Sequence, residues 1–93
     1  MSASIESLIE RAAAILKAAG AHEVYLFGSA VSGGVRPDSD VDLAVSGLPP
    51  EVFFRAMSDA ERALGLPLDL IDLDEDNPFT RYLRSEGELR RVG

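Results

Sequence analysis

The segment of residues 40–47, DVDLAVSG, constrains the fold more strongly than any other part of the chain. Its side chains alternate between polar and apolar, which indicates a β-strand because successive side chains of a strand point to opposite faces. One face carries Asp40, Asp42 and Ala44, and the other carries Val41, Leu43 and Val45. The apolar face has to be covered by a second layer of structure, whereas the other face presents two carboxylates.

The rest of the chain supplies segments for such a layer. A stripe of apolar residues over residues 5–19 predicts a helix with Ser4 as its N-cap and Gly20 at its C-terminal end. Further helices are predicted over residues 51–64 and 77–87, strands over residues 23–27 and 66–73, a turn and loop over residues 29–39, and a weak strand or tail over residues 88–93. This order predicts an α+β fold, in which a small mixed β-sheet has helices packed on one face.

At 93 residues, the chain is expected to form one domain that spans residues 1–93. It has no cysteine, which excludes disulfides and thiolate metal sites, and we expect a cytoplasmic location. No segment reaches the roughly 18 apolar residues that a membrane span needs, so no membrane partner is expected. The net charge of -7 argues against direct binding to nucleic acid. Such an acidic chain can still bind a nucleotide if bound cations supply positive charge.

Asp40 and Asp42 are candidate ligands of a divalent cation. They project to the same side of the predicted strand about 6.6 Å apart along it, so both can reach one hard cation. Asp is depleted in strands and like charges repel, and this local conflict favours a functional site over an exposed surface strand. The segment is not a calcium-binding EF-hand loop, because Leu43 replaces the required glycine and Pro49 replaces the required glutamate.

Gly28 and Ser29 follow directly after the predicted strand over residues 23–27. Backbone amides at such a turn are free to face an anion, and the serine hydroxyl can donate a hydrogen bond to it. Glycine also lets the backbone approach a phosphate closely. The pair is unremarkable as a turn alone, so its interpretation depends on the aspartates that follow.

Gly28-Ser29, ten intervening residues and then Asp40-Val41-Asp42 resemble the signature of the DNA polymerase β-like nucleotidyltransferase superfamily. The chain is most similar to its minimal members, the MNT or MntA-type antitoxins of HEPN/MNT pairs. The family pattern is hydrophobic-Gly-Ser, a spacer, Asp-x-Asp on the next strand and a third carboxylate on a later strand. LFGS, SDVDLAV and LDLIDL match these parts in order, so the resemblance spans nearly the whole chain.

The third carboxylate has four candidates in LDLIDLDED: Asp69, Asp72, Asp74 and Asp76. Asp69 matches the family best, because it lies within the predicted strand and is flanked by leucines. Asp72 would point to the opposite face of that strand. Asp74 and Asp76 fall in the turn before a predicted helix, where carboxylates commonly cap helices.

The resemblance implies a Mg²⁺-dependent nucleotidyltransferase that transfers AMP from ATP to a hydroxyl. The implied catalytic residues and ligands of two Mg²⁺ ions are Asp40, Asp42 and Asp69, and the implied nucleotide-binding residues are Gly28, Ser29 and Arg36. Family members commonly carry arginines just after the Gly-Ser pair. This chain has Ala30 and Ser32 there, and Arg36 is the nearest cation.

The family also implies a partner, a HEPN-domain toxin that is an RNase and receives AMP on a tyrosine hydroxyl. The chain would then be the antitoxin of a toxin-antitoxin pair. The alternative is a catalytically weak binding module that neutralises a toxin by occlusion, which the missing arginines favour. Transfer to a small molecule or to an RNA end is a third interpretation. The sequence does not indicate the nucleotide preference, the number of nucleotides transferred or the oligomeric state.

Overall fold

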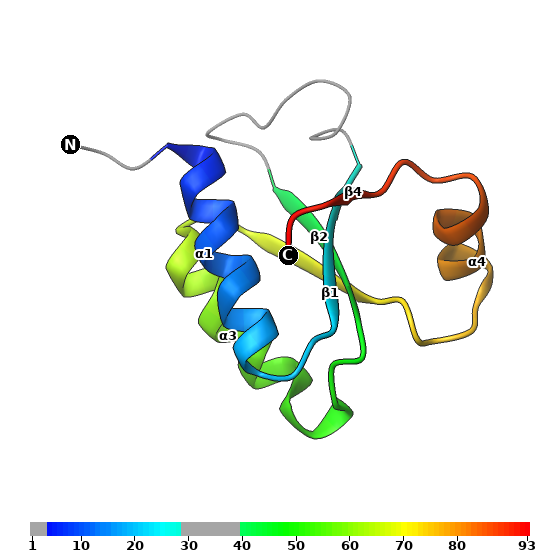
Figure 1. The fold of residues 1–93 in the computed structure, drawn as a ribbon, viewed down its shortest axis with the longest axis horizontal. Coiled ribbons are helices and arrows are strands. Elements are labelled where there is room, and N and C mark those ends of the chain that lie inside the picture. The colour runs from blue at the N-terminus through cyan, green and yellow to red at the C-terminus, as the bar shows by residue number, and fades with distance from the viewer. Residues whose placement is uncertain (1–3, 29–39) are drawn as a thin grey trace.

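The computed structural model describes residues 4–28 and 40–93 of the chain (Figure 1). The elements are α1 (Ile5–Ala18), β1 (Glu23–Phe27), β2 (Val41–Ser46), the 3-10 turn η1 (Pro50–Val52), α3 (Phe53–Leu64), β3 (Leu68–Asp72), α4 (Pro78–Ser85) and β4 (Arg90–Arg91). Every helix and strand predicted outside residues 29–39 is present. The turn and loop predicted over residues 29–39 lie outside the described residues.

The four strands form one mixed sheet in the order β3-β2-β1-β4. β1 is antiparallel to both β2 and β4, whereas β2 and β3 are parallel. The register places Phe27 of β1 opposite Asp42 of β2, and Asp42 opposite Asp69 of β3. These three residues therefore form one row across the sheet, and paired residues of neighbouring strands point to the same face.

α1 and α3 cover one face of the sheet, and they lie side by side in Figure 1. α1 begins where predicted, because the Ser4 side chain accepts a hydrogen bond from the Ser7 backbone amide. The two helices can approach closely because each contributes small buried residues to the interface. These are Ala12 and Ala13 of α1 and Ala56 and Ala60 of α3. Together with the apolar face of the strands they form the main core.

The helix predicted over residues 51–64 begins differently from the prediction. Its first residues form the 3-10 turn η1, with Pro50 at its start, before the α-helical part begins at Phe53. Such tight turns are common at helix N-termini. The predicted end is confirmed, since Gly65 adopts a left-handed conformation with φ of 75° directly after α3.

α4 lies on the side of the sheet away from α1 and α3 (Figure 1). Its Leu83 is buried against Phe27 and Ala44 in a second, smaller apolar cluster. Asn77 caps the helix, and the buried Thr80 completes a capping box by bonding back to the Asn77 backbone amide. The α+β prediction is confirmed: the two long helices form the layer on one face, and this short helix covers part of the other.

Within the described residues, every helix is too short or too polar to cross a lipid bilayer.

Candidate functional site

Three aspartates gather on the face of the sheet that α1 and α3 leave uncovered. Asp42 and Asp69 are register partners on the parallel strands β2 and β3, so their side chains leave neighbouring strands on the same face. Asp40 is exposed and directly precedes β2, two residues before Asp42. The alternation of β2 turns its apolar side chains, Val41, Leu43 and Val45, into the main core. The same alternation that builds the core therefore presents the acids together.

The environment of Asp42 disfavours its charged form. Partial burial raises the pKa of the Asp42 carboxyl, and the negative charges of Asp69 and Asp40 raise it further. The three carboxylates are thus close enough for their charges to interact. An excess of negative charge with hard oxygen donors is the environment that Mg²⁺ prefers.

The carboxylates do not form a complete set of ligands as they stand. Across residues 4–28 and 40–93, no three His, Asp or Glu side chains are arranged so that they could hold a metal ion. The carboxylate oxygens fit Mg²⁺ by their donor chemistry alone. The assignment of Asp40, Asp42 and Asp69 as metal ligands and catalytic residues therefore stays a prediction.

Gly28 lies directly against the Asp42 carboxylate. It has a φ of 82°, in the left-handed region, and a Cβ atom built on it would lie 2.5 Å from Asp42 Oδ2. The sequence suggested that glycine is needed here for the approach of a phosphate. The structure adds a second reason, since the missing side chain leaves room for the carboxylate. The predicted nucleotide-binding residues Ser29 and Arg36 lie outside the described residues.

The other acids near the end of β3 have structural partners of their own. Asp72 accepts a hydrogen bond from the Asp74 amide at 2.9 Å, and Asp74 accepts one from the Gly47 amide at 2.6 Å. Asp76 receives two hydrogen bonds from the Arg81 guanidinium, which lowers the pKa of the Asp76 carboxyl. Asp72, Asp74 and Asp76 therefore hold the turn between β3 and α4 in place, and Asp69 is the acid of this segment that lies opposite Asp42.

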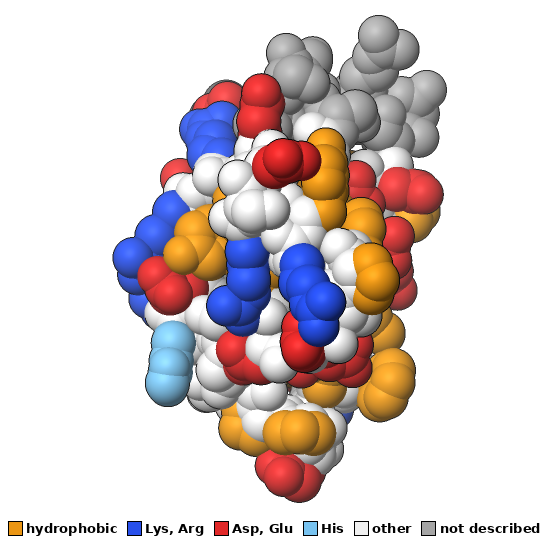
Figure 2. Space-filling model, turned by 90° about the vertical axis from the view of Figure 1, so that its right-hand side faces the viewer, with side chains coloured by type: hydrophobic (Ala, Val, Ile, Leu, Met, Phe, Trp, Pro, Cys, Tyr) orange, Lys and Arg blue, Asp and Glu red, His pale blue; other side chains and the backbone are white. Residues whose placement is uncertain are grey.

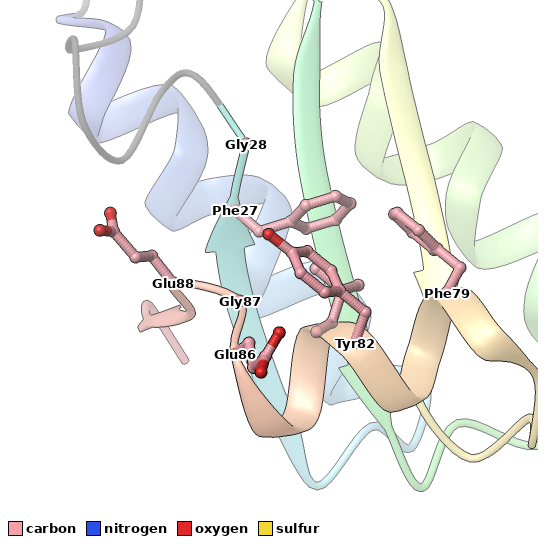
Figure 3. Close-up of a pocket in the computed structure, with 8 residues that line it drawn as sticks. Phe27, Gly28, Phe79, Tyr82, Glu86, Gly87 and Glu88 are labelled. Atoms are coloured by element: carbon pink, nitrogen blue, oxygen red, sulfur yellow. The ribbon is translucent and has the colours of Figure 1, made fainter.

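A pocket that sequence reasoning missed adjoins the aspartates (Figure 3). Its volume is about 440 Å³, and its lining consists of Phe27, Gly28, Phe79, Tyr82, Leu83, Glu86, Gly87 and Glu88. The pocket lies between the end of β1 and α4 with the turn that follows it. A signal was present in the sequence, because Phe79 and Tyr82 are three residues apart and so share one face of the predicted helix.

Two of the pocket's aromatic rings are unusually open to solvent. Tyr82 is 55% exposed and Phe79 is 48% exposed. The Phe79 ring packs edge-to-face with the Phe27 ring at a centroid distance of 6.1 Å. Figure 2 shows the face that carries α4, on which hydrophobic side chains are exposed next to acidic ones. The site as a whole thus combines an acidic row with an aromatic pocket.

Comparison with solved structures gives several matches over most of the chain. A minimal nucleotidyltransferase is 28% identical, with a TM-score of 0.68, and the match covers 92% of this chain and 95% of that one. A toxin-antitoxin crystallised with AMP-PNP has a TM-score of 0.69 at 23% identity, over 90% of this chain and 72% of that one. The toxin-antitoxin MntA-HepT has a TM-score of 0.64 at 18% identity, and the match covers 92% of this chain and 69% of that one. The last two show likeness of fold alone.

Comparison with curated proteins gave no match. A family model described as polymerase beta, nucleotidyltransferase matches residues 10–89. That range contains β1, β2 and β3 with Asp40, Asp42 and Asp69, and it extends through α4 to the end of the pocket lining. The chain therefore belongs to the polymerase beta nucleotidyltransferase family.

Proposed function

We propose that the chain is a Mg²⁺-dependent adenylyltransferase that transfers AMP from ATP to a tyrosine hydroxyl of a HEPN-domain toxin, and that it acts as the toxin's antitoxin. The observation that carries this proposal is the row of Asp42 and Asp69 on neighbouring strands, with Asp40 beside it, on a nucleotidyltransferase fold. Two similar structures are toxin-antitoxin complexes, and one of them contains AMP-PNP. These likenesses support a nucleotide as donor and a toxin as partner.

The proposed reaction exchanges one phosphorus–oxygen bond for another. The acceptor hydroxyl oxygen bonds to the α-phosphorus of ATP, the bond from that phosphorus to the oxygen bridging to the β-phosphate breaks, and pyrophosphate leaves. The hydroxyl proton passes to a solvent water molecule. When bound, two Mg²⁺ ions would neutralise the triphosphate and hold the attacking and leaving oxygens in line. Asp40, Asp42 and Asp69 would hold these ions.

The position of Asp69 suits the acceptor side of this reaction. β3 is an edge strand of the sheet, and Asp69 is exposed on it. A hydroxyl carried by another protein can therefore reach this carboxylate without entering the core. Gly28 lies against the Asp42 carboxylate, and Gly28, Ser29 and Arg36 would hold the phosphates.

The test uses ATP labelled in the α-phosphate, Mg²⁺ and the cognate toxin. The wild-type chain should label the toxin, and Asp42→Asn and Asp69→Asn should each lower the rate by more than about 100-fold, since each removes metal-mediated charge stabilisation worth several kcal/mol. Asp72→Asn is the matched control. It keeps the oxygen that accepts from the Asp74 amide, so its rate should stay within about twofold of wild type. Loss of labelling in Asp72→Asn with retention in Asp69→Asn would reassign the third acid.

The second candidate function is neutralisation by occlusion, favoured by Ala30 and Ser32 where the family carries arginines. It predicts that the wild-type chain protects against the toxin while no label reaches it. Mg²⁺ binding separates the two functions without any toxin. The adenylyltransferase should be stabilised by Mg²⁺ in a thermal melt, and Asp42→Asn should abolish that shift. An identical shift in both proteins contradicts the assignment of Asp42 as a ligand.

A further inference from the structure

The aromatic pocket begins where the acidic row ends. The row runs from Asp69 through Asp42 to Phe27, and Phe27 is also part of the pocket lining. Neighbouring strands are about 4.8 Å apart, so the pocket starts one strand from Asp42 and two strands, about 10 Å, from Asp69. Gly28 takes part in both, because it lines the pocket and lies against Asp42. The pocket is therefore within reach of a ligand held at the aspartates.

The lining of the pocket suits a flat, uncharged ring better than a phosphate. Phe27, Phe79 and Tyr82 supply three aromatic rings, which come together from β1 and α4 in Figure 3. Among the described residues that line the pocket, none is Lys or Arg, and two are the acidic residues Glu86 and Glu88. The Glu88 side chain points away from the three rings in Figure 3, which leaves Glu86 as the nearer carboxylate. Carboxylates repel phosphate groups and accept hydrogen bonds from N–H donors. The volume of about 440 Å³ lies within the range of small-molecule sites.

We propose that this pocket binds the base of the donor nucleotide, with the base stacked on Tyr82 and Phe79 and its amino group donating to Glu86. This inference rests on the proposed function, which brings the triphosphate to the aspartates. The exposure of both rings is then explained, because the base would cover them. A carboxylate only accepts hydrogen bonds, so the pocket suits adenine, whose exocyclic amino group offers two N–H donors, better than uracil, which offers a single imide N–H between two carbonyl acceptors.

Binding of AMP-PNP and of inorganic tripolyphosphate, each with Mg²⁺ and without a partner protein, tests the proposal. Tripolyphosphate has no base, so it reports on the aspartates and the phosphate site alone. Tyr82→Ala should weaken AMP-PNP by about 5- to 150-fold, the range expected for one base stacked on one aromatic ring, and should leave tripolyphosphate unchanged. Tyr82→Phe keeps the ring and should bind AMP-PNP like wild type.

Phe54→Ala is the matched control, because Phe54 is a 73% exposed ring on α3, on the other side of the sheet. It should leave the binding of both ligands unchanged. The variant Glu86→Gln tests base selection. Amide groups both donate and accept, so the preference for ATP over UTP should shrink in this variant. A preference that stays the same refutes selection by this carboxylate.

The proposal and the function on which it rests fail in different ways. Unchanged AMP-PNP affinity in Tyr82→Ala, or equal weakening of AMP-PNP and tripolyphosphate, overturns the base pocket while leaving the transferase proposal intact. If Tyr82→Ala keeps its AMP-PNP affinity but transfers less AMP to the toxin, the base pocket is also overturned, and the pocket would instead bind the acceptor. Absence of Mg²⁺-dependent binding of either ligand to the wild-type chain overturns both. Unchanged Mg²⁺-dependent binding in Asp42→Asn contradicts the metal site alone.

Discussion

Replacing Asp42 with asparagine should stabilise the metal-free protein while removing its proposed activity. Asp42 lies opposite Asp69 in the sheet, and Asp40 adds a third negative charge nearby. Asn has almost the same shape as Asp, so the substitution removes the charge with little change in packing. The fold then no longer has to bring like charges together. This result would show that the site is held at the expense of stability.

The expected gain follows from the register of the two strands. Directly opposite residues have Cβ atoms about 5 Å apart. Two unit charges at ~5 Å repel by about 0.8 kcal/mol in water and by about 3 kcal/mol at the effective permittivity near a protein surface. Asp69 is exposed, which favours the lower value. We therefore expect Asp42→Asn to raise the free energy of unfolding by about 1 kcal/mol, or the Tm by about 4–8 °C.

The assay is thermal unfolding followed by circular dichroism at about pH 7, with a chelator to remove divalent ions. Asp69→Asn should give a similar gain, and the double variant should gain little beyond either single variant, because the first substitution already removes the repulsion. Glu75→Gln controls for the change in net charge, since Glu75 is an exposed acid in the turn before α4. Additive gains in the double variant, or no gain in Asp42→Asn, would refute the reasoning.

The contribution of Asp42 to folding stability should change with pH in a definite direction. The raised pKa of Asp42 means that the folded state binds a proton that the unfolded state releases, once the pH exceeds the usual aspartate value of 3.8. The contribution of Asp42 to stability is therefore complete below that pH and is lost as the pH rises through the raised pKa. Asp42→Asn should lack this decline. A wild-type stability that rises with pH in the same way as that of the variant would contradict the sign.

Three further substitutions test other parts of the structure by thermal unfolding. Gly28→Ala should lower the free energy of unfolding by about 1–3 kcal/mol because of left-handed strain, and by more because of the clash with Asp42. The control Gly65→Ala has a φ of 75° but nothing within 4 Å of the added Cβ atom, so it should lose only the strain contribution. Equal losses in the two variants would refute the clash. Leu43→Ala removes a fully buried side chain and should cost about 2–5 kcal/mol; a loss below about 1 kcal/mol would contradict its place in the core. Thr80→Val deletes the hydroxyl that donates to the Glu75 carbonyl at 2.6 Å and accepts from the Asn77 amide. It should cost about 1–3 kcal/mol, and a neutral result would mean that these two hydrogen bonds add nothing to stability.

Most of the element boundaries could be predicted because local signals mark them. Ser4 caps the first helix, Gly65 ends the second long helix, and Asn77 followed by Pro78 starts the short one. Each of these signals depends on one or two residues and their own backbone. The 3-10 start of the second long helix was missed, because a proline at a helix start is compatible with either kind of turn.

The arrangement of the site could be predicted only in part. Alternation in residues 40–47 predicts which face carries the carboxylates, but it does not say which residue of a parallel neighbour lies opposite Asp42. The pocket was missed because its walls are Phe27 and residues of α4, about fifty positions apart in the chain. An amphipathic pattern in an eight-residue helix shows that one side is buried, but it does not show against which face of the sheet the helix packs.

The strand order has a consequence for the kinetics of the proposed transfer. The pocket adjoins β1, on one flank of Asp42, and the exposed edge strand β3 lies on the other flank. The two substrates would therefore enter from opposite sides and would not compete for space. We expect a ternary complex in which both are present at once, and thus sequential rather than ping-pong steady-state kinetics.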